Sequence, residues 1–247
     1  MRAPVVGLAE RYAAGATIPR HRHPVGQLVF AASGVMTVGT PAGTWVVPPL
    51  RAVWLPPRTV HGIRMIGTVA VRMVYVAPSH AGGLPGAPCV VQVSPLLREC
   101  ILRLMELPAS RPADGPAARL VAVLLDEIRA APVSPLHLPR PADPRARRLV
   151  RALEADPSDR RPLAAWARTT GASTRTLARL FQRETGLGFR AWRQQLRLLR
   201  GLERLAAGEP VTRVALDVGY DSPSAFVAAF RRALGTSPGR YFAGRAP

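Results

Sequence analysis

The sequence predicts an α+β protein of two domains, a small β domain that ends in helices and an all-α domain behind it. Three observations predict this class. Short apolar runs between Gly and Pro turns fill residues 1–78, a pattern typical of β strands. Five prolines lie within residues 132–144, and from residue 145 onward the spacing is helical and repeats. We therefore expect domains over 1–131 and 145–247, joined by a stiff Pro-rich linker over 132–144.

The first domain is expected to be a small sandwich or barrel followed by two helices. Its apolar runs follow one another closely, as in small all-β folds. They are Gln27–Ala31, Val35–Val38, Thr44–Val47, Ala52–Leu55 and Val69–Val76. Apolar residues at helical spacing then predict helices over 94–107 and 115–131.

The internal repeat is the most informative feature of the second domain. Ala167-x-x-x-Gly171 returns 48 residues later as Ala215-x-x-x-Gly219. In each copy the Gly can take the positive φ of a tight turn, and the small Ala lets a second helix cross closely. Ser173 and Ser222 follow at positions typical of helix N-caps. The repeat predicts two tandem helix-turn-helix units; a plain helical bundle is the alternative.

A helix expected over 189–207 joins the two units. At about 1.5 Å per residue it spans roughly 28 Å, against about 34 Å between successive major grooves on one face of DNA. It can therefore hold two recognition helices near one DNA turn apart. In the first of them, Arg175 and Arg179 lie opposite the apolar pair of Leu177 and Phe181, where arginine can reach guanine edges.

The charge of the chain indicates a polyanionic partner. All 34 basic residues are Arg, and the formal net charge is +19. From Asp143 onward there are 20 Arg against 9 acidic residues, which concentrates the excess in the helical domain. Nucleic acid is the first expectation from such a distribution. A generally basic protein without that partner is the alternative.

Several classes are disfavoured by composition. Cys89 and Cys100 are the only cysteines, too few for a disulfide framework, so a reducing compartment is expected. The N-terminus lacks the apolar stretch of a signal peptide. No run reaches the roughly 18 apolar residues of a membrane span. We therefore expect a cytoplasmic protein with no membrane partner.

A long match to a known family lies in residues 219–241. Their sequence, GYDSPSAFVAAFRRALGTSPGRY, resembles the signature of the AraC/XylS family of bacterial regulators, and the resemblance extends over 145–247. It implies a regulator of transcription, activator or repressor, that binds double-stranded DNA and carries an N-terminal sensing domain. It also implies a regulator that binds DNA as a dimer or a monomer, with RNA polymerase among its partners. The helices of the first domain are expected to form the contact of a homodimer; that they only cover the barrel is the alternative.

The resemblance and the repeat together give the candidate DNA-binding residues. They are Ser173, Arg175, Thr176, Arg179, Arg183, Ser222, Ser224, Arg231 and Arg232. One departure concerns the middle of the second recognition helix. Ala225 and Ala228 stand where this family often has a polar residue that contacts bases. The second unit is therefore expected to contribute less to sequence recognition.

Two short motifs in the first domain resemble those of cupins. Gly15-x5-His21-x-His23-x3-Gln27-x6-Gly34 is similar to the first, with Gln in place of the usual Glu. Pro56-x-Arg58-x-x-His61 is similar to the second, with Arg in place of Gly. The resemblance implies a cupin-like β-barrel with His21, His23, Gln27 and His61 facing one cavity. These ligands can hold a divalent transition metal; a metal-free cavity for a small organic effector is the alternative.

The leading hypothesis is a sequence-specific DNA-binding regulator that responds to an effector and is not an enzyme. The main alternative is a cupin-type metalloenzyme tethered to nucleic acid. It would need a positioned acid or base beside the metal. After Glu10 the next acidic residue is Glu99, so the β region lacks a carboxylate for that role. A third class, an architectural protein that binds DNA through charge alone, would differ in salt dependence and specificity.

Overall fold

A computed structural model of the chain describes residues 4–108 and 114–243. The chain divides into two compact units, which are described separately. One contains Met1–Thr40 and Trp45–His137, and the other contains Pro41–Thr44 and Leu138–Pro247. The strands are β1 (Val5–Tyr12), β2 (Thr17–His21), β3 (Gly26–Thr40), β4 (Gly43–Val47), β5 (Arg51–Leu55), β6 (His61–Val76), β7 (Cys89–Gln92), β8 (Val133–Ser134) and β9 (His137–Pro139).

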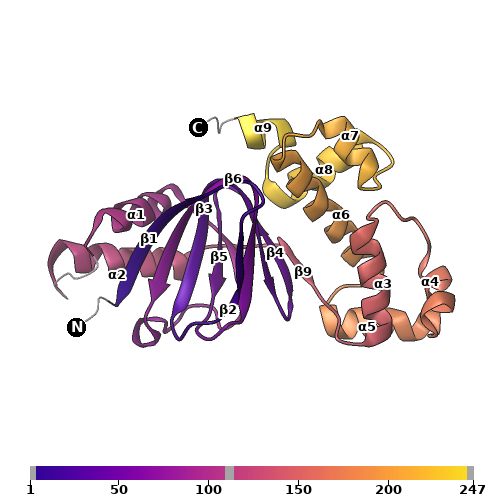
Figure 1. The fold of residues 1–247 in the computed structure, drawn as a ribbon, viewed down its shortest axis with the longest axis horizontal. Coiled ribbons are helices and arrows are strands. Elements are labelled where there is room, and N and C mark those ends of the chain that lie inside the picture. The colour runs from indigo at the N-terminus through magenta and orange to yellow at the C-terminus, as the bar shows by residue number, and fades with distance from the viewer. Residues whose placement is uncertain (1–3, 109–113, 244–247) are drawn as a thin grey trace. The chain divides into compact units, whose positions relative to one another are not determined.

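Two long antiparallel strands, β3 and β6, organise the N-terminal sheet (Figure 1). Their pairing runs from Gly26 opposite Val76 to Gly39 opposite Gly62, with register shifts between Ala31 and Val35. On one side of this irregularity β6 also pairs with β1, and on the other side it pairs with β2. The main strand order is β1-β6-β3-β5-β7-β8. Among the described strands, no pairing joins β1 to β8, so the predicted barrel is not seen as a closed sheet.

Two helices cover one face of this sheet (Figure 1). They are α1 (Pro95–Glu106) and α2 (Gly115–Ala130), close to the ranges predicted from helical spacing. Ser94 caps α1 by accepting the Leu97 N–H at 3.0 Å, and its hydroxyl donates to Glu127 of α2 at 2.5 Å. The shared core contains the sheet residues Leu28, Phe30, Trp54, Val74 and Val76 with the helix residues Leu97, Ile101, Leu104, Val121, Leu124, Leu125 and Ile128.

Strand alternation places a second set of side chains on the opposite face of the sheet. Gln27 precedes the core residue Leu28, and Tyr75 lies between Val74 and Val76. Gln27 and Tyr75 are also direct partners in the β3–β6 register. This face carries the candidate effector residues.

The segment expected to be a linker is partly ordered into the first unit. Val133 and Ser134 form β8, which pairs with Val91 and Val90 of β7. A stiff extended chain is suited to edge pairing, and proline can occupy such an edge where its missing N–H faces outward. The division between the units falls at His137.

The second unit contains the two predicted helix-turn-helix units. Its helices are α3 (Pro144–Ala155), α4 (Leu163–Thr170), α5 (Thr174–Thr185), α6 (Phe189–Ala206), α7 (Val211–Asp217), α8 (Pro223–Leu234) and α9 (Pro238–Ala243). Helices α4 and α5 form the first helix-turn-helix unit, α7 and α8 form the second helix-turn-helix unit, and α6 connects them. Gly171 and Gly219, in the two turns, have φ of 69° and 90°, the left-handed conformation predicted for both.

The connecting helix is anchored at both ends by buried contacts. Trp192 is fully buried, and its Nε1 donates to the Pro139 carbonyl at 2.7 Å. Near the other end, Gly201 lies against the Phe226 ring of α8, where an added Cβ would come within 2.6 Å. The absence of a side chain at Gly201 therefore permits α6 and α8 to cross closely.

Candidate DNA-binding surface and three-histidine cluster

Helix α5 presents the candidate recognition surface of the first unit. Ser173 caps it by accepting the Thr176 N–H at 3.0 Å, and its hydroxyl also contacts the Thr176 hydroxyl at 2.8 Å. Leu177 and Phe181 are fully buried, as their i,i+4 spacing predicts. The exposed side chains are those of Thr174, Arg175, Ala178, Arg179, Gln182 and Arg183. The hydroxyls of Ser173 and Thr176 thus shape the helix start, and the arginines face solvent.

The three arginines of α5 differ in how they are held. Arg183 forms an ion pair with Glu184 at 2.8 Å. For Arg175 and Arg179, the described part of the chain supplies no hydrogen-bonding or ionic partner. Their guanidinium groups therefore keep all their donors for an external ligand.

Helix α8 presents a different surface at the equivalent place. Ser222 caps it by accepting the Ala225 N–H at 3.2 Å, and its hydroxyl also contacts that of Ser224 at 2.9 Å. Arg231 and Arg232 are exposed in the later turns. With an offset of 49 residues, Arg179 corresponds to Ala228. The exposed middle of α8 therefore has no hydrogen-bond donor where α5 carries a free arginine.

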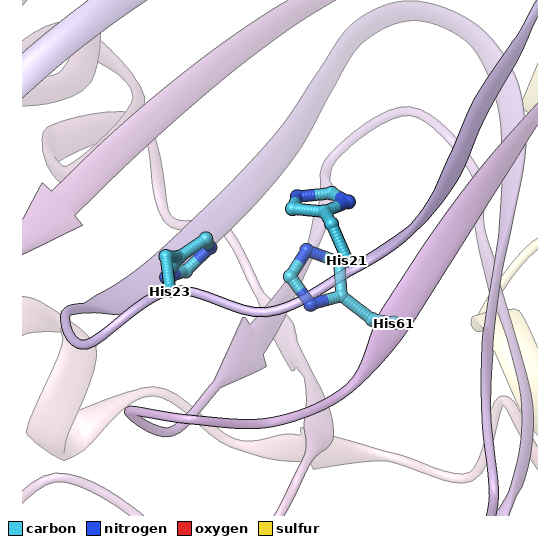
Figure 2. Close-up of side chains that lie close together, drawn as sticks. All are labelled: His21, His23 and His61. Atoms are coloured by element: carbon cyan, nitrogen blue, oxygen red, sulfur yellow. The ribbon is translucent and has the colours of Figure 1, made fainter.

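The candidate effector residues come together as the sequence predicted. Ring nitrogens of His21 on β2, His23 after it and His61 on β6 lie within 4.8 Å of one another (Figure 2). Gln27 joins them through its Oε1, which lies 3.1 Å from His23 Nε2. The two cupin-like motifs also meet through the backbone, because the Arg58 N–H donates to the His23 carbonyl at 2.8 Å.

The backbone fixes the tautomer of each histidine in the cluster. Nδ1 of His21, His23 and His61 lies 2.8–2.9 Å from the carbonyls of Pro19, Val25 and Thr59, respectively. A carbonyl can only accept, so each Nδ1 must carry the proton. In the neutral rings, each Nε2 then keeps a lone pair; that of His61 is buried, and that of His23 faces the Gln27 side chain, whose amide must present its NH2 group to donate to it.

His61 is the most constrained of the three. It is fully buried, and its Nε2 has no hydrogen-bond partner among the described residues. Burial lowers the pKa of His61, and the nearby His21 and His23 lower it further, while the Thr59 hydrogen bond acts in the opposite direction. His61 is therefore held neutral with a buried, unsatisfied acceptor.

Tyr75 was not predicted as part of this region, and the unusual backbone conformation of Arg58 was not predicted either. Tyr75 packs edge-on against His23 with 5.7 Å between ring centroids. Its position opposite Gln27 depends on the β3–β6 register, which the sequence alone does not give. Arg58 has φ of 64°, so it adopts the left-handed conformation usual for Gly at a position where cupins have Gly. That substitution, visible in the sequence, was the available signal for an unusual backbone there.

Comparison with known proteins settles the family. The family profile described as "AraC-like ligand binding domain" matches residues 3–167, and the one described as "Helix-turn-helix domain" matches residues 166–244. The HTH-type transcriptional regulator NimR of Escherichia coli K12 is 39% identical over 227 residues, covering 92% of this chain and 83% of NimR. The chain belongs to the AraC family of transcriptional regulators.

Other similarities within the AraC family are more partial. The HTH-type transcriptional regulator RipA of Corynebacterium glutamicum is 35% identical over 107 residues, covering 43% of this chain and 32% of RipA. The structure of unsaturated fatty acid bound ToxT from Vibrio cholerae covers 98% of this chain and 97% of ToxT, at 11% identity and a TM-score of 0.42. These values are too low for ToxT to support an argument about the ligand of this chain.

Membership in the AraC family assigns the helical unit to DNA binding and the sheet unit to ligand binding. The chain is a DNA-binding transcriptional regulator, and its relatives are regulators rather than enzymes, which confirms the leading hypothesis over the metalloenzyme. In the described ranges, no helix combines the length and apolarity needed to cross a membrane.

Many arginines of this AraC-family DNA-binding unit stabilise the fold and are not free for DNA. Arg145 pairs with Asp143, and Arg161 pairs with Asp159. Arg204 pairs with both Glu209 and Asp217. Arg148 donates to the Thr170 carbonyl at 2.8 Å, and Arg197 donates to three loop carbonyls. The net charge inferred from the sequence therefore overstates the number of cations available to phosphate.

Acid is expected to weaken the DNA-binding unit through Glu184 and Asp143. Glu184 Oε2 accepts the N–H groups of Asp143 and Ala142 at 3.0 and 2.9 Å, and these bonds, with Arg183, lower the pKa of Glu184. The hydrogen bond from Arg145 lowers the pKa of Asp143 to about 2. A depressed folded-state pKa gives stability that is present above the unfolded value of about 4 and lost as pH falls through the folded one.

We therefore expect Glu184→Gln to lower the melting temperature at pH 7 and to differ less from the wild type at low pH, as the pH falls below about 4 and through the lowered folded-state pKa of Glu184. Thermal unfolding followed against pH measures this. Asp126→Asn, at an exposed ion pair on α2 with Arg129, is the control and should show little difference at either pH. A Glu184→Gln effect that does not change with pH would contradict the electrostatic account.

Proposed function

We propose that this AraC-family regulator binds its operator mainly through base contacts from α5 and responds to a ligand held at the three-histidine cluster. For DNA, Arg175 and Arg179 supply base contacts, with Arg183, Arg231 and Arg232 directed to phosphate. Ser173, Thr176, Ser222 and Ser224 form the helix starts that approach the DNA backbone. The free guanidinium groups on α5 and the alanines at the equivalent places on α8 support this division.

The observation that carries the effector proposal is the orientation of the histidines. All three donate Nδ1–H to backbone carbonyls, so the Nε2 lone pairs of His21 and His61, and that of His23 once the Gln27 amide turns away from it, are the groups offered to a ligand. Metal-binding histidines usually donate their second ring nitrogen to such a partner, which fixes the tautomer. The buried and unpartnered Nε2 of His61 is the atom that a ligand would satisfy.

A divalent transition metal fits this set of donors. Three imidazole nitrogens and the Gln27 amide oxygen suit a borderline ion such as Zn²⁺. Metal–nitrogen distances of about 2.0–2.1 Å place ligand nitrogens about 3.4 Å apart in a tetrahedral site. The present separation of up to 4.8 Å would then have to shorten by side-chain movement. Bound here, a metal would link β2 to β6 and make their spacing depend on occupancy.

A small organic effector is the second candidate. Gln27 is neutral and already contacts His23, which makes it a weaker metal ligand than the Glu usual in cupins. The aromatic ring of Tyr75 and the polar edge of His23 would together offer stacking and hydrogen bonding. The same residues would then recognise a polar, planar compound.

The finer organisation is part of the same proposal. We place the sensing domain at 1–131, the linker at 132–144 and the DNA-binding domain at 145–247. Strands β3 and β6 pair with each other on both sides of the irregularity at residues 31–35, and this continuity supports a cupin-like barrel around the cluster. A homodimer through α1 and α2 is supported by exposed Leu96 and Val123. We further propose action in the cytoplasm, with RNA polymerase as the partner of the DNA-bound form.

If the cluster holds a metal, protein purified without chelator should carry about one equivalent, removable by chelator. His23→Ala should reduce this to background, because it removes one of three nitrogen ligands. His80→Ala, an exposed histidine outside the cluster, should keep the full equivalent. Elemental analysis gives the content, and operator binding with and without metal tests the response. If the wild type contains no metal and takes none up, the organic effector remains.

A further inference from the structure

Arg197 of α6 connects the two helix-turn-helix units through side-chain contacts. Its Nε donates to the Pro157 carbonyl at 2.9 Å, and its Nη2 donates to the carbonyls of Ser158 and Asp159 at 3.3 and 3.1 Å. These three acceptors lie in the loop between α3 and α4. Helix α4 packs on α5, so this loop belongs to the first helix-turn-helix unit.

The turn of the second helix-turn-helix unit, at Gly219, packs against the same loop and the Arg197 guanidinium. A Cβ on Gly219 would lie 2.7 Å from Arg197 Nη2 and 2.8 Å from the Ser158 Cα. Next to it, Arg160 of the loop pairs with Asp221 at 2.8 Å, although both side chains are exposed. Residues 157–160 are therefore held against residues 219–221, with the Arg197 guanidinium between them.

The backbone alone connects the two helix-turn-helix units less firmly than these side-chain contacts do. Helix α6 follows Gly186 and Gly188 and ends next to Gly208, and Gly186 and Gly208 have φ of 71° and 89°. Glycine permits a wide range of backbone conformations, so these junctions need side-chain contacts to fix the angle between the units. Arg197 supplies such contacts at a point near the start of α8.

We infer that Arg197 is a positioning residue that fixes the distance and angle between recognition helices α5 and α8. The guanidinium has five N–H donors in a rigid plane, which lets it join three carbonyls at once. Because these carbonyls occupy its Nε and Nη2, we assign Arg197 to holding the fold rather than to contacting phosphate. The inference rests on the proposal that both helices engage DNA, and it does not depend on the effector.

The substitution Arg197→Lys tests this without changing net charge. A single ammonium cannot replace the planar set of donors, so the two units should become looser. Spin labels on cysteines introduced at exposed Ala178 and Ala228, with Cys89 and Cys100 replaced, report the distance between α5 and α8. We expect one narrow distance for the wild type and at least a twofold broader distribution for Arg197→Lys. Arg190→Lys, exposed on the same helix, should leave it narrow.

A second variant approaches the same junction from the other side. Gly219→Ala places a methyl group against Ser158 and the guanidinium, so it should shift or broaden the distance while Arg197 is intact. Unchanged narrow distributions in both variants would overturn the inference. Should Arg197→Lys fail to fold, Gly219→Ala alone decides, since its effect is expected at the same contact.

DNA binding separates positioning from a phosphate contact. On an operator with both half-sites, Arg197→Lys should lose about five- to tenfold in affinity. On DNA with only the half-site of α5, it should lose less than twofold, because α5 itself is unchanged. An equal loss on both DNAs would identify Arg197 as a phosphate contact and overturn the positioning role.

Discussion

Arg179→Ala is expected to weaken operator binding by about 1–3 kcal/mol and to relax the preference at one base position. Arg179 is exposed on α5, one turn from Arg175, and has no partner among the described residues. It can therefore make the bidentate contact that arginine forms with guanine. Selection of binding sites from a random DNA library, with the wild type and the variant, measures both effects.

Arg232→Ala is the matched control on α8. Arg232 lies in the last turns of that helix, where backbone phosphate is the expected contact. Its loss should weaken binding to all DNA sequences to a similar extent. It should also reduce the slope of log affinity against log salt concentration by about one, because one phosphate contact is removed. If Arg179→Ala keeps the wild-type base preferences, or if the α8 half-site proves as selective as that of α5, the proposed division between the helices is wrong.

Gly34→Ala is expected to destabilise the sheet unit by roughly 3 kcal/mol, summed from two effects. Gly34 has φ of 76°, a conformation that costs a residue with a side chain about 1–2 kcal/mol. Its added Cβ would also lie 2.3 Å from the Thr68 carbonyl, so the β3–β6 pairing must shift. Overpacking of this kind typically costs about 1–3 kcal/mol.

Gly39→Ala provides a control on the same strand. Gly39 has no positive φ, and an added Cβ would meet nothing within 4 Å. Thermal or denaturant unfolding of both variants measures the difference. If the two alanine variants proved equally stable, the irregularity at residues 31–35 would not need glycine, and the backbone account of β3 would fail.

Local signals in the sequence predicted much of the helical unit. Ser173 and Ser222 are N-caps, and Gly171 and Gly219 take the left-handed turns predicted for them. These features depend on residues only a few positions apart, so a pattern contains them. The convergence of His21, His23 and His61 was also predicted, although from motif resemblance rather than from spacing.

Features that depend on long-range register were not accessible in the same way. Tyr75 joins the histidine cluster because β6 pairs with β3 in one particular register. The carbonyls that fix the histidine tautomers depend on backbone direction, which residue types do not encode. In the net charge, Arg197 was only one more cation available to DNA. Its acceptors lie about 40 positions away in the chain, so no local pattern showed that it is bound to the fold. Composition cannot distinguish an arginine bound to the fold from a free one.

The strand pairing also has a consequence for the order of folding. In the sheet unit, Val5 pairs with Val76 and Gly26 also pairs with Val76, so β1 has no partner until β6 has been made. Contacts between distant residues slow folding, whereas helical units with near neighbours fold quickly. The DNA-binding unit is synthesised after the sensing unit, yet it is built from helices, whose backbone hydrogen bonds join residues about four positions apart. It should therefore reach its native structure faster than the sensing unit that precedes it.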